Sequence, residues 1–501
     1  MNALAFPRRG SLALPVWLRG PAAVGLLFLL FAAVWLWHLD SVALSPPADN
    51  IEQLTWMRSL EWGYYKHPPV PTWMMWAFAK LAGWSAWSSY LLGALCTLVS
   101  VALYGLLLRD IQGPRFALVG VLAALGITFY NGRLNYFNHN VALMLWVSAS
   151  AWLWWRLLTV PRLRWWLALG AVAGLGMLSK YQYALVAAGG LWLYVQQGLW
   201  RSRLQRRGLL LCVALAALMC LPHAVWLLGR SRGPLDYAMH SSLGAGLGTA
   251  ARAAWSAQWL ADWLFNRCLP AVLLLVPVWW MQRRAAPSCN EVPGGRTVAG
   301  AGRALLCVWG LLPPALMAAM GLLWGVDLQL QWGTAFALWT VPALMLALDI
   351  REKSLGEGRV MAVAGVVFLL LQGALLWQSH DSSAFGRHPP GMPHWREFPS
   401  QALALAVAEP ARQALGGPID IVSGPPAASG ALALLLDEKP RVLIAHDLSI
   451  SPWIQPAEWA EKGVLELWPP GEGPSDVRRA SNGWGWRVSG PRVLAFGHGD
   501  G

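Results

Sequence analysis

The sequence predicts a polytopic α-helical membrane protein with about eleven spanning helices, followed by a small α/β domain. Three observations predict this class. The chain of 501 residues is 56% hydrophobic and only 13% charged, whereas a soluble domain carries about 25% charged residues. It contains 34 tryptophans, and tryptophan favours the interface between membrane and water. Apolar stretches recur up to about residue 377, after which short β-like runs alternate with helical stretches.

The apolar stretches come first, because they define the membrane part of the chain. A helix needs about 20 apolar residues to cross a bilayer, and fewer where the membrane is thin. The first stretch follows Arg19 and ends in Trp35 and Trp37 without a small-residue cleavage site, so we interpret it as a retained span rather than a signal peptide. The expected spans are 21–39, 87–108, 117–132, 141–158, 165–179, 183–199, 208–228, 268–281, 304–323, 332–349 and 360–377.

The basic residues set the expected orientation. With the N-terminus in the cytoplasm, the cytoplasmic segments hold 19 Lys and Arg residues and the opposite loops hold 9. Short loops rich in Lys and Arg stay in the cytoplasm. We therefore expect residues 1–377 to form the membrane domain, with residues 378–501 on the non-cytoplasmic side. The net charge of +13 then reflects loop placement, and no nucleic-acid partner is expected.

Two outer segments are too long to be plain connectors. Residues 50–62 and 70–83 have amphipathic patterns, which predicts two helices lying along the outer membrane surface. A second outer segment, from about 229 to 267, includes a helical stretch at 251–263.

The C-terminal tail is predicted to be a small soluble α/β domain. Strands are expected at 419–422, 442–445, 464–467 and 492–495, and helices at 400–415, 429–436 and 456–461. The tail contains no cysteine, and the six cysteines elsewhere have no metal-binding spacing.

In this topology the unusual polar residues gather at the outer face. Charged and strongly polar groups are expensive near hydrocarbon, so such a cluster indicates a functional site. The candidates come from the first outer loop, from the turn after the third span and from the end of the fifth span: Asp49, Glu52, Tyr65, Lys66, His67, Arg133, Asn138, His139, Asn140, Lys180 and Tyr181.

These residue types fit a lipid-linked anionic substrate. Lys and Arg side chains bind a phosphate or diphosphate, and a carboxylate accepts the proton of an attacking hydroxyl. One histidine between two amides, as in Asn138–Asn140, is a poor set of metal ligands and suits hydrogen bonding to a sugar. The sequence supports no cofactor; a divalent metal stays open without a ligand set to hold it.

Three of the candidates have structural alternatives. Glu52 can act through its charge near a helix N-terminus. His67 precedes Pro68 and can simply fix a turn. Lys180 can snorkel from a span end to the interface.

Two motifs resemble a known family. The run from Asp49 through Trp56 and then Gly63-Tyr-Tyr-Lys-His-Pro-Pro69 resembles the first outer loop of the protein-mannosyltransferase and ArnT-like glycosyltransferases. Gly174-Leu-Gly-Met-Leu-Ser-Lys-Tyr181 resembles a span of that family that ends in Lys-Tyr. The resemblance implies a GT-C fold and a bacterial inner-membrane location with a periplasmic C-terminal domain. It also implies transfer of a sugar, with inversion, from a polyprenyl phosphate to a glycolipid, glycan or protein.

Carried over by position, the resemblance implies roles for single residues. Asp49 would be the catalytic base or would position the acceptor, Lys66 and Lys180 would bind the donor phosphate, and His67 would support the loop. Many members have a second acidic residue in the next outer loop, where this chain has Asn135–Asn140. Three alternatives stay open: the second acid is absent, Glu52 takes over its role, or an amide and a histidine of this stretch take over its role.

A transporter or flippase of lipid-linked sugars is the alternative from another class. Transporters place ionisable groups near the middle of the membrane. Here the centres of the predicted spans are almost free of charge, which favours the enzyme.

Overall fold

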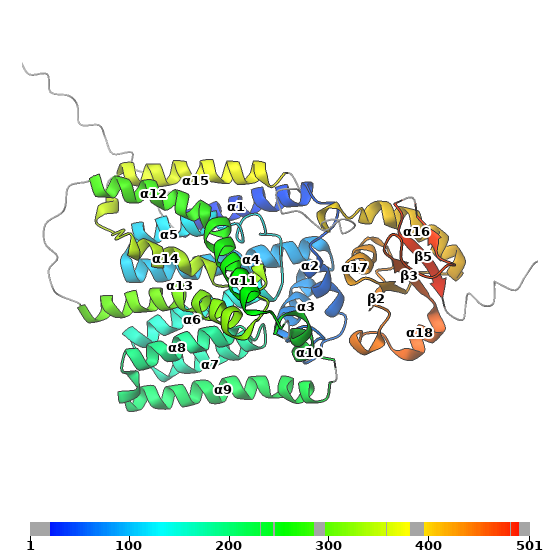
Figure 1. The fold of residues 1–501 in the computed structure, drawn as a ribbon, viewed down its shortest axis with the longest axis horizontal. Coiled ribbons are helices and arrows are strands. Elements are labelled where there is room, and N and C mark those ends of the chain that lie inside the picture. The colour runs from blue at the N-terminus through cyan, green and yellow to red at the C-terminus, as the bar shows by residue number, and fades with distance from the viewer. Residues whose placement is uncertain are drawn as a thin grey trace, which may run out of the picture.

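The computed structural model describes residues 21–230, 232–243, 246–284, 296–356, 358–380, 395–480 and 482–489. In Figure 1 the long helices run side by side as a bundle, and an α/β unit sits beyond one end of it. Helices α2, α3 and α10 lie at that same end, between the bundle and the α/β unit (Figure 1).

Each of the eleven predicted apolar stretches falls on a helix. The helices are α1 (Pro21–Ser41), α4 (Ala86–Gln112), α5 (Pro114–Gly126), α6 (His139–Thr159), α7 (Leu163–Met177), α8 (Tyr183–Gln196), α9 (Arg203–Leu228), α12 (Leu269–Arg284), α13 (Arg296–Trp324), α14 (Ala337–Ala347) and α15 (Gly358–Gln378).

Six of these helices are long and apolar enough to cross a membrane, within the part of the chain that the structure describes: α1, α4, α6, α9, α13 and α15. A seventh span results if α12 is joined to the preceding α11 (Thr249–Ala261) and η4 (Asp262–Arg267), which meet α12 at a bend of 58°. Helices α5, α7, α8 and α14 are apolar but only 10–17 residues long. The count of eleven spans therefore stays a prediction.

Burial separates central from peripheral helices. In the most apolar window of α6, 67% of the residues are buried, against 17% in α9 and in α15. Helix α6 is thus enclosed by other helices, whereas α9 and α15 keep most of their apolar side chains on the outside. An exposed apolar helix surface of this kind is suited to lipid.

Two short helices cover the end of the bundle where the α/β unit sits. The first is α2 (Ala48–Trp56), which ends six residues earlier than the predicted 50–62. The second is α3 (Val70–Ala82), which confirms the prediction of a helix at 70–83. Between them the backbones of Tyr64 and His67 exchange hydrogen bonds of 2.9 and 3.2 Å, which close a turn. This turn ends the extended part of the loop and directs the chain into α3.

Short helical segments complete the membrane part. They are η2 (Leu199–Arg201), α10 (Pro234–Ala238), η3 (Met239–Leu243), η5 (Leu330–Gly333) and η6 (Ser354–Gly356). The predicted helix at 251–263 corresponds to α11.

The C-terminal unit contains a mixed sheet. In the described residues the strand order is β2-β1-β3-β5-β4, with β1 parallel to both β2 and β3 and with β5 antiparallel to β3 and β4. The strands are β1 (Ile421–Gly424), β2 (Arg441–Ile444), β3 (Val464–Trp468), β4 (Arg478–Arg479) and β5 (Gly485–Ser489). Its helical segments are η8 (Trp395–Glu397), α16 (Ser400–Leu415), α17 (Pro426–Leu435), η9 (Leu448–Ile450) and α18 (Pro456–Lys462).

Three of the four predicted strands correspond to β1, β2 and β3 within two residues. The fourth, at 492–495, lies outside the described residues. Strands β4 and β5 were not predicted, because Arg478–Arg479 is short and charged and β5 begins with glycine.

Candidate active site

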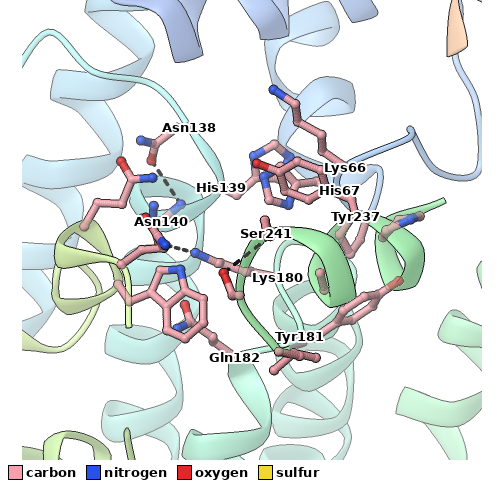
Figure 2. A pocket seen from close by; sticks show the side chains of 18 of the residues that line it. Lys66, His67, Asn138, His139, Asn140, Lys180, Tyr181, Gln182, Tyr237 and Ser241 are labelled. Carbon is pink, nitrogen blue, oxygen red and sulfur yellow. Dashed lines mark hydrogen bonds between the residues drawn. The ribbon is translucent and has the colours of Figure 1, made fainter. Parts of the chain in front are cut away.

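A cavity of about 450 Å³ opens between α2, the 64–67 turn, the start of α6, the turn after α7, and the segment α10–η3. Figure 2 shows its polar side chains pointing toward a common space. Nine of the eleven predicted site residues line it: Asp49, Glu52, Lys66, His67, Asn138, His139, Asn140, Lys180 and Tyr181. The expected topology therefore brings together residues that lie up to 132 positions apart in the chain.

Helix α2 supplies both carboxylates. Asp49 and Glu52 are three residues apart, which places them on one face of the helix, and both line the cavity. The helix is held by the side chain of Asn50, which is fully buried. Its amide donates to Ser89 Oγ at 2.9 Å and to the carbonyl oxygen of Asn135 at 2.8 Å. Position 50 therefore anchors α2 to α4 and to the turn before α6.

Asp49 is linked to α6 through Asn138. The Asn138 side-chain amide donates to Asp49 Oδ2 at 2.8 Å, while its Oδ1 accepts from the backbone N–H groups of Asn140 and Val141, each at 3.0 Å. Asn138 is thus the N-cap of α6 and also orients the Asp49 carboxylate. Asn138 lies within the stretch Asn135–Asn140, where many members of the resembled family have a second acidic residue.

Glu52 and Lys66 form an ion pair in the cavity wall, with Nζ and Oε2 3.1 Å apart. Burial raises the pKa of Glu52, and the Lys66 ammonium opposes that shift. For Lys66, burial lowers the pKa, but Glu52, Tyr65 and Tyr237 together outweigh burial and the net pKa is raised. Lys66 is therefore a cation throughout the neutral range. The second oxygen of Glu52, Oε1, is buried and has no hydrogen-bond partner among the described residues.

Lys180 presents a second ammonium to the cavity from the turn between α7 and α8. Its Nζ donates to Asn140 Oδ1 at 2.6 Å (Figure 2) and lies 5.6 Å from the centre of the Trp332 ring. Only 9% of the residue is exposed. Burial lowers the pKa of Lys180 to about 7, and the nearby Asp49 carboxylate opposes this. Because its hydrogen-bond partner is a neutral amide and not a carboxylate, the protonated Lys180 side chain would attract an anion that enters the cavity.

Two histidine rings lie against each other in the cavity. The ring centres of His67 and His139 are 3.8 Å apart, and the rings are inclined by 38°. Burial lowers the pKa of His67 well below its usual value, and the charges of Lys180 and Lys66 lower it further, so the ring is neutral. Nε2 of His139 is buried without a hydrogen-bond partner among the described residues. His67 both closes the turn through its backbone and lines the cavity through its ring.

Two predicted residues do not line the cavity. Arg133 lies over the ring of Tyr136, with Cζ 5.4 Å from its centre. Tyr65 lies behind Lys66, whose Nζ is 5.3 Å from the centre of the Tyr65 ring. Their roles in binding the donor phosphate and in positioning substrate stay predictions.

The sequence reasoning did not select several lining residues. Tyr237 and Ser241 come from the segment α10–η3, Gln182 lies between α7 and α8, and Trp332 lies in η5. The Tyr237 ring centre lies 6.0 Å from that of His67 (Figure 2), and Lys66 Nζ is 5.6 Å from the Tyr237 ring. The one available signal was Gly233-Pro234, a pair typical of a helix start.

In the described part of the chain, no three His, Cys, Asp or Glu side chains form a group that could hold a metal ion. Within the cavity each carboxylate already has a protein partner, Asn138 for Asp49 and Lys66 for Glu52.

The helical bundle, the surface helices and the external α/β unit together define a GT-C type fold, that of ArnT. The chain matches the structure of ArnT from Cupriavidus metallidurans in the apo state with a TM-score of 0.54 at 16% identity, covering 96% of this chain and 100% of that one. It matches ArnT from the same organism bound to undecaprenyl phosphate with a TM-score of 0.52 at 18% identity, covering 89% and 93% of the two chains. At these identities the likeness concerns the fold.

Residues 66–226 match the family model described as dolichyl-phosphate-mannose-protein mannosyltransferase. This match contains Lys66, His67 and the Lys180–Tyr181 motif, so the family resemblance inferred from the sequence is confirmed.

Sequence relatives come from Rhizobium johnstonii. The lipopolysaccharide core galacturonosyltransferases RgtA and RgtB are 30% and 29% identical over 184 and 224 residues, which is 36% and 43% of this chain. The lipid A galacturonosyltransferase RgtD is 27% identical over 232 residues, or 44% of this chain. The matches span only 37%, 44% and 48% of the respective relatives' own lengths. The matched relatives are thus all glycosyltransferases of lipopolysaccharide components.

Proposed function

We propose that this protein is an inverting membrane glycosyltransferase that moves a sugar from a polyprenyl phosphate to a glycolipid of the lipopolysaccharide class. The observation that carries the proposal is the cavity in which two carboxylates and two lysines face one another. The fold shared with ArnT, for which a complex with undecaprenyl phosphate exists, supports the choice of donor.

The cavity suits a donor with an anionic phosphodiester. Lys66 and Lys180 present ammonium groups from two different segments, and such groups stabilise the negative charge that grows on a departing phosphate. Lys66 is already partly neutralised by Glu52, whereas Lys180 donates its hydrogen bond to an amide. We therefore assign the larger share of phosphate binding to Lys180.

The proposed reaction is a direct displacement at the anomeric carbon. An acceptor hydroxyl attacks that carbon from the side opposite the phosphate, and its proton passes to the Asp49 carboxylate. The bond between the anomeric carbon and the phosphate oxygen breaks, and the polyprenyl phosphate leaves with the electron pair. Asn138 holds Asp49 Oδ2 and so orients the base. Glu52, with its unpartnered Oε1, would accept a hydrogen bond from a sugar hydroxyl.

The named relatives guide the choice of sugar and acceptor. All three are galacturonosyltransferases, two acting on lipopolysaccharide core and one on lipid A. Galacturonic acid on a polyprenyl phosphate is therefore the first donor to offer, and lipid A and core oligosaccharide are the first acceptors. The site is proposed to face the periplasm, where the positive-inside rule places the first outer loop.

The test uses the full chain in lipid nanodiscs with radiolabelled polyprenyl-phosphate galacturonic acid and lipopolysaccharide acceptors. We expect label in the glycolipid fraction, and NMR of the product should give an anomeric configuration opposite to that of the donor. Retained configuration would disprove direct displacement. Transfer to protein and not to glycolipid would disprove the acceptor.

A further inference from the structure

Helix α2 belongs structurally to two parts of the protein at once. One face carries Asp49 and Glu52 into the cavity. On the opposite side Ile51, which is 2% exposed, lies in the apolar core of the C-terminal unit together with Val422, Ala428 and Leu432. The helix that bears the carboxylates therefore completes the core of a domain whose own residues come from the other end of the chain.

A second set of contacts fixes the end of the same helix. Trp56, the last residue of α2, and Tyr64 from the following turn share an apolar cluster with Ile421, Val442 and Trp453 of the C-terminal unit. The Trp56 and Tyr64 rings stack with their centres 5.0 Å apart.

A polar contact adds to these. The Arg58 guanidinium donates to the carbonyl oxygen of Lys439 at 2.9 Å. The C-terminal unit thus contacts α2 in its first half, at its end and in the loop that leads from it.

The closest approach is between α17 and α2, at Gly430. A Cβ at position 430 would overlap Cγ2 of Ile51 and would lie 3.2 Å from Thr55 Oγ1. Isoleucine in a helix has one strongly preferred χ1 rotamer, so Ile51 cannot simply turn away. The absence of a side chain at Gly430 is therefore what lets the two helices come this close.

We propose that the C-terminal unit positions the catalytic helix, with Gly430 and Ile51 as the positioning residues that set where Asp49 and Glu52 lie in the cavity. This inference rests on the proposed function for its catalytic consequence, whereas the coupling between α17 and α2 does not depend on it. Neither residue touches the cavity, so both would act on the reaction only through α2.

Gly430→Ala tests the proposal sharply, because alanine favours a helix more than glycine does. The variant should strengthen α17 itself and disturb only its contact with α2. A displacement of about 1 Å at a reacting group can lower the rate about 100-fold. We expect kcat to fall at least about 10-fold, while the donor Kd, which depends on the lysines, changes less than about 3-fold. Gly365→Ala in α15, where a Cβ would meet nothing within 4 Å, is the matched control and should behave as wild type.

A double variant separates positioning from general damage. Ile51→Ala removes the methyl group that the Cβ introduced by Gly430→Ala would strike, so the double variant should regain part of the kcat lost in Gly430→Ala, up to the kcat of Ile51→Ala alone. Wild-type kcat in Gly430→Ala, or a double variant no better than Gly430→Ala alone, would overturn the proposal. If Gly430→Ala does not fold, Ile51→Ala alone decides: the proposal requires a lower kcat with donor Kd retained, and wild-type kcat would overturn it.

Hydrogen exchange of the α2 amides provides a readout without catalysis. Exchange over residues 48–56 should rise in Gly430→Ala and not in Gly365→Ala, and equal exchange in both would overturn the coupling. If the wild-type protein transfers no sugar, the proposed function fails, and the exchange result alone then decides whether the C-terminal unit positions α2.

Discussion

Lys180 is the residue whose charge state should control donor binding near neutral pH. Burial lowers the pKa of Lys180 to about 7, with the Asp49 carboxylate opposing the shift, so the side chain is a cation below pH 7 and neutral above it. The donor phosphodiester is an anion over this whole range. We therefore predict that the affinity for the polyprenyl-phosphate sugar is highest below pH 7 and falls as the pH rises to 9.

The magnitude follows from the geometry. At an effective dielectric constant of about 20, two unit charges about 4 Å apart attract by about 4 kcal/mol. Part of this is lost, because Lys180 already donates to Asn140 at 2.6 Å and the phosphate must be desolvated. A net contribution of about 2 kcal/mol corresponds to a roughly 30-fold change in Kd. Lys180→Met should therefore bind about 30-fold more weakly at pH 6, and wild type should approach that value at pH 9.

The assay is equilibrium binding of a radiolabelled polyprenyl-phosphate sugar, whose phosphodiester keeps one negative charge from pH 6 to 9, to the full chain in nanodiscs. Lys180→Arg is the matched control, because arginine keeps its charge throughout and should give a flat profile. Burial lowers the pKa of Lys66, but Glu52, Tyr65 and Tyr237 together raise it above its usual value, so Lys66 stays charged and should not contribute a slope. A flat wild-type profile, or the same decline in Lys180→Arg, would refute the assignment.

Two further predictions concern the partners of the carboxylates. Asn138→Ala should lower the transfer rate and also destabilise the protein by about 0.5–2 kcal/mol through loss of the α6 cap. Asn138→Ser keeps an N-cap oxygen but has no amide to donate to Asp49, so it should lower the rate without that loss of stability; equal unfolding temperatures for the two variants would contradict this. Lys66 and Glu52 form an ion pair at 3.1 Å, so the effects of Lys66→Met and Glu52→Gln on donor Kd should not add. A double-mutant cycle should give a coupling energy of about 0.5–3 kcal/mol. Additive effects would show that the pair does not form in the working enzyme.

The gathering of the site was predictable from topology. Loops on one side of a bundle must meet at one end of it, so Asp49, Asn138 and Lys180 were expected together although 89 and 42 residues separate the successive members. The length of the apolar stretches likewise predicted the eleven helical segments, because a helix that faces lipid or other helices must be apolar along its length.

The partners of the side chains were not predictable in the same way. Arg133 has the charge to bind phosphate, but its side chain lies over Tyr136 outside the cavity. Which way such a side chain points depends on packing, which the sequence does not show. Tyr237 lines the cavity from a segment whose sequence has no strong secondary-structure pattern. Ile51 and Gly430 are far apart in the sequence and meet where two apolar helix surfaces pack together. The sequence of each helix indicates an apolar face but not which other face it packs against.

Asp49 is proposed to act as the base in sugar transfer from a lipid-linked donor. This role is tested most directly by comparing wild type with Asp49→Asn in proteoliposomes that contain radiolabelled polyprenyl-phosphate sugar and a lipopolysaccharide acceptor. We expect label to move to the acceptor with wild type, and we expect Asp49→Asn to lower the rate by at least about 100-fold, within the range for losing a general base. Transfer at the wild-type rate by Asp49→Asn would contradict the role of Asp49. Movement of the intact donor between leaflets without any transfer would contradict the enzyme itself and establish a transporter.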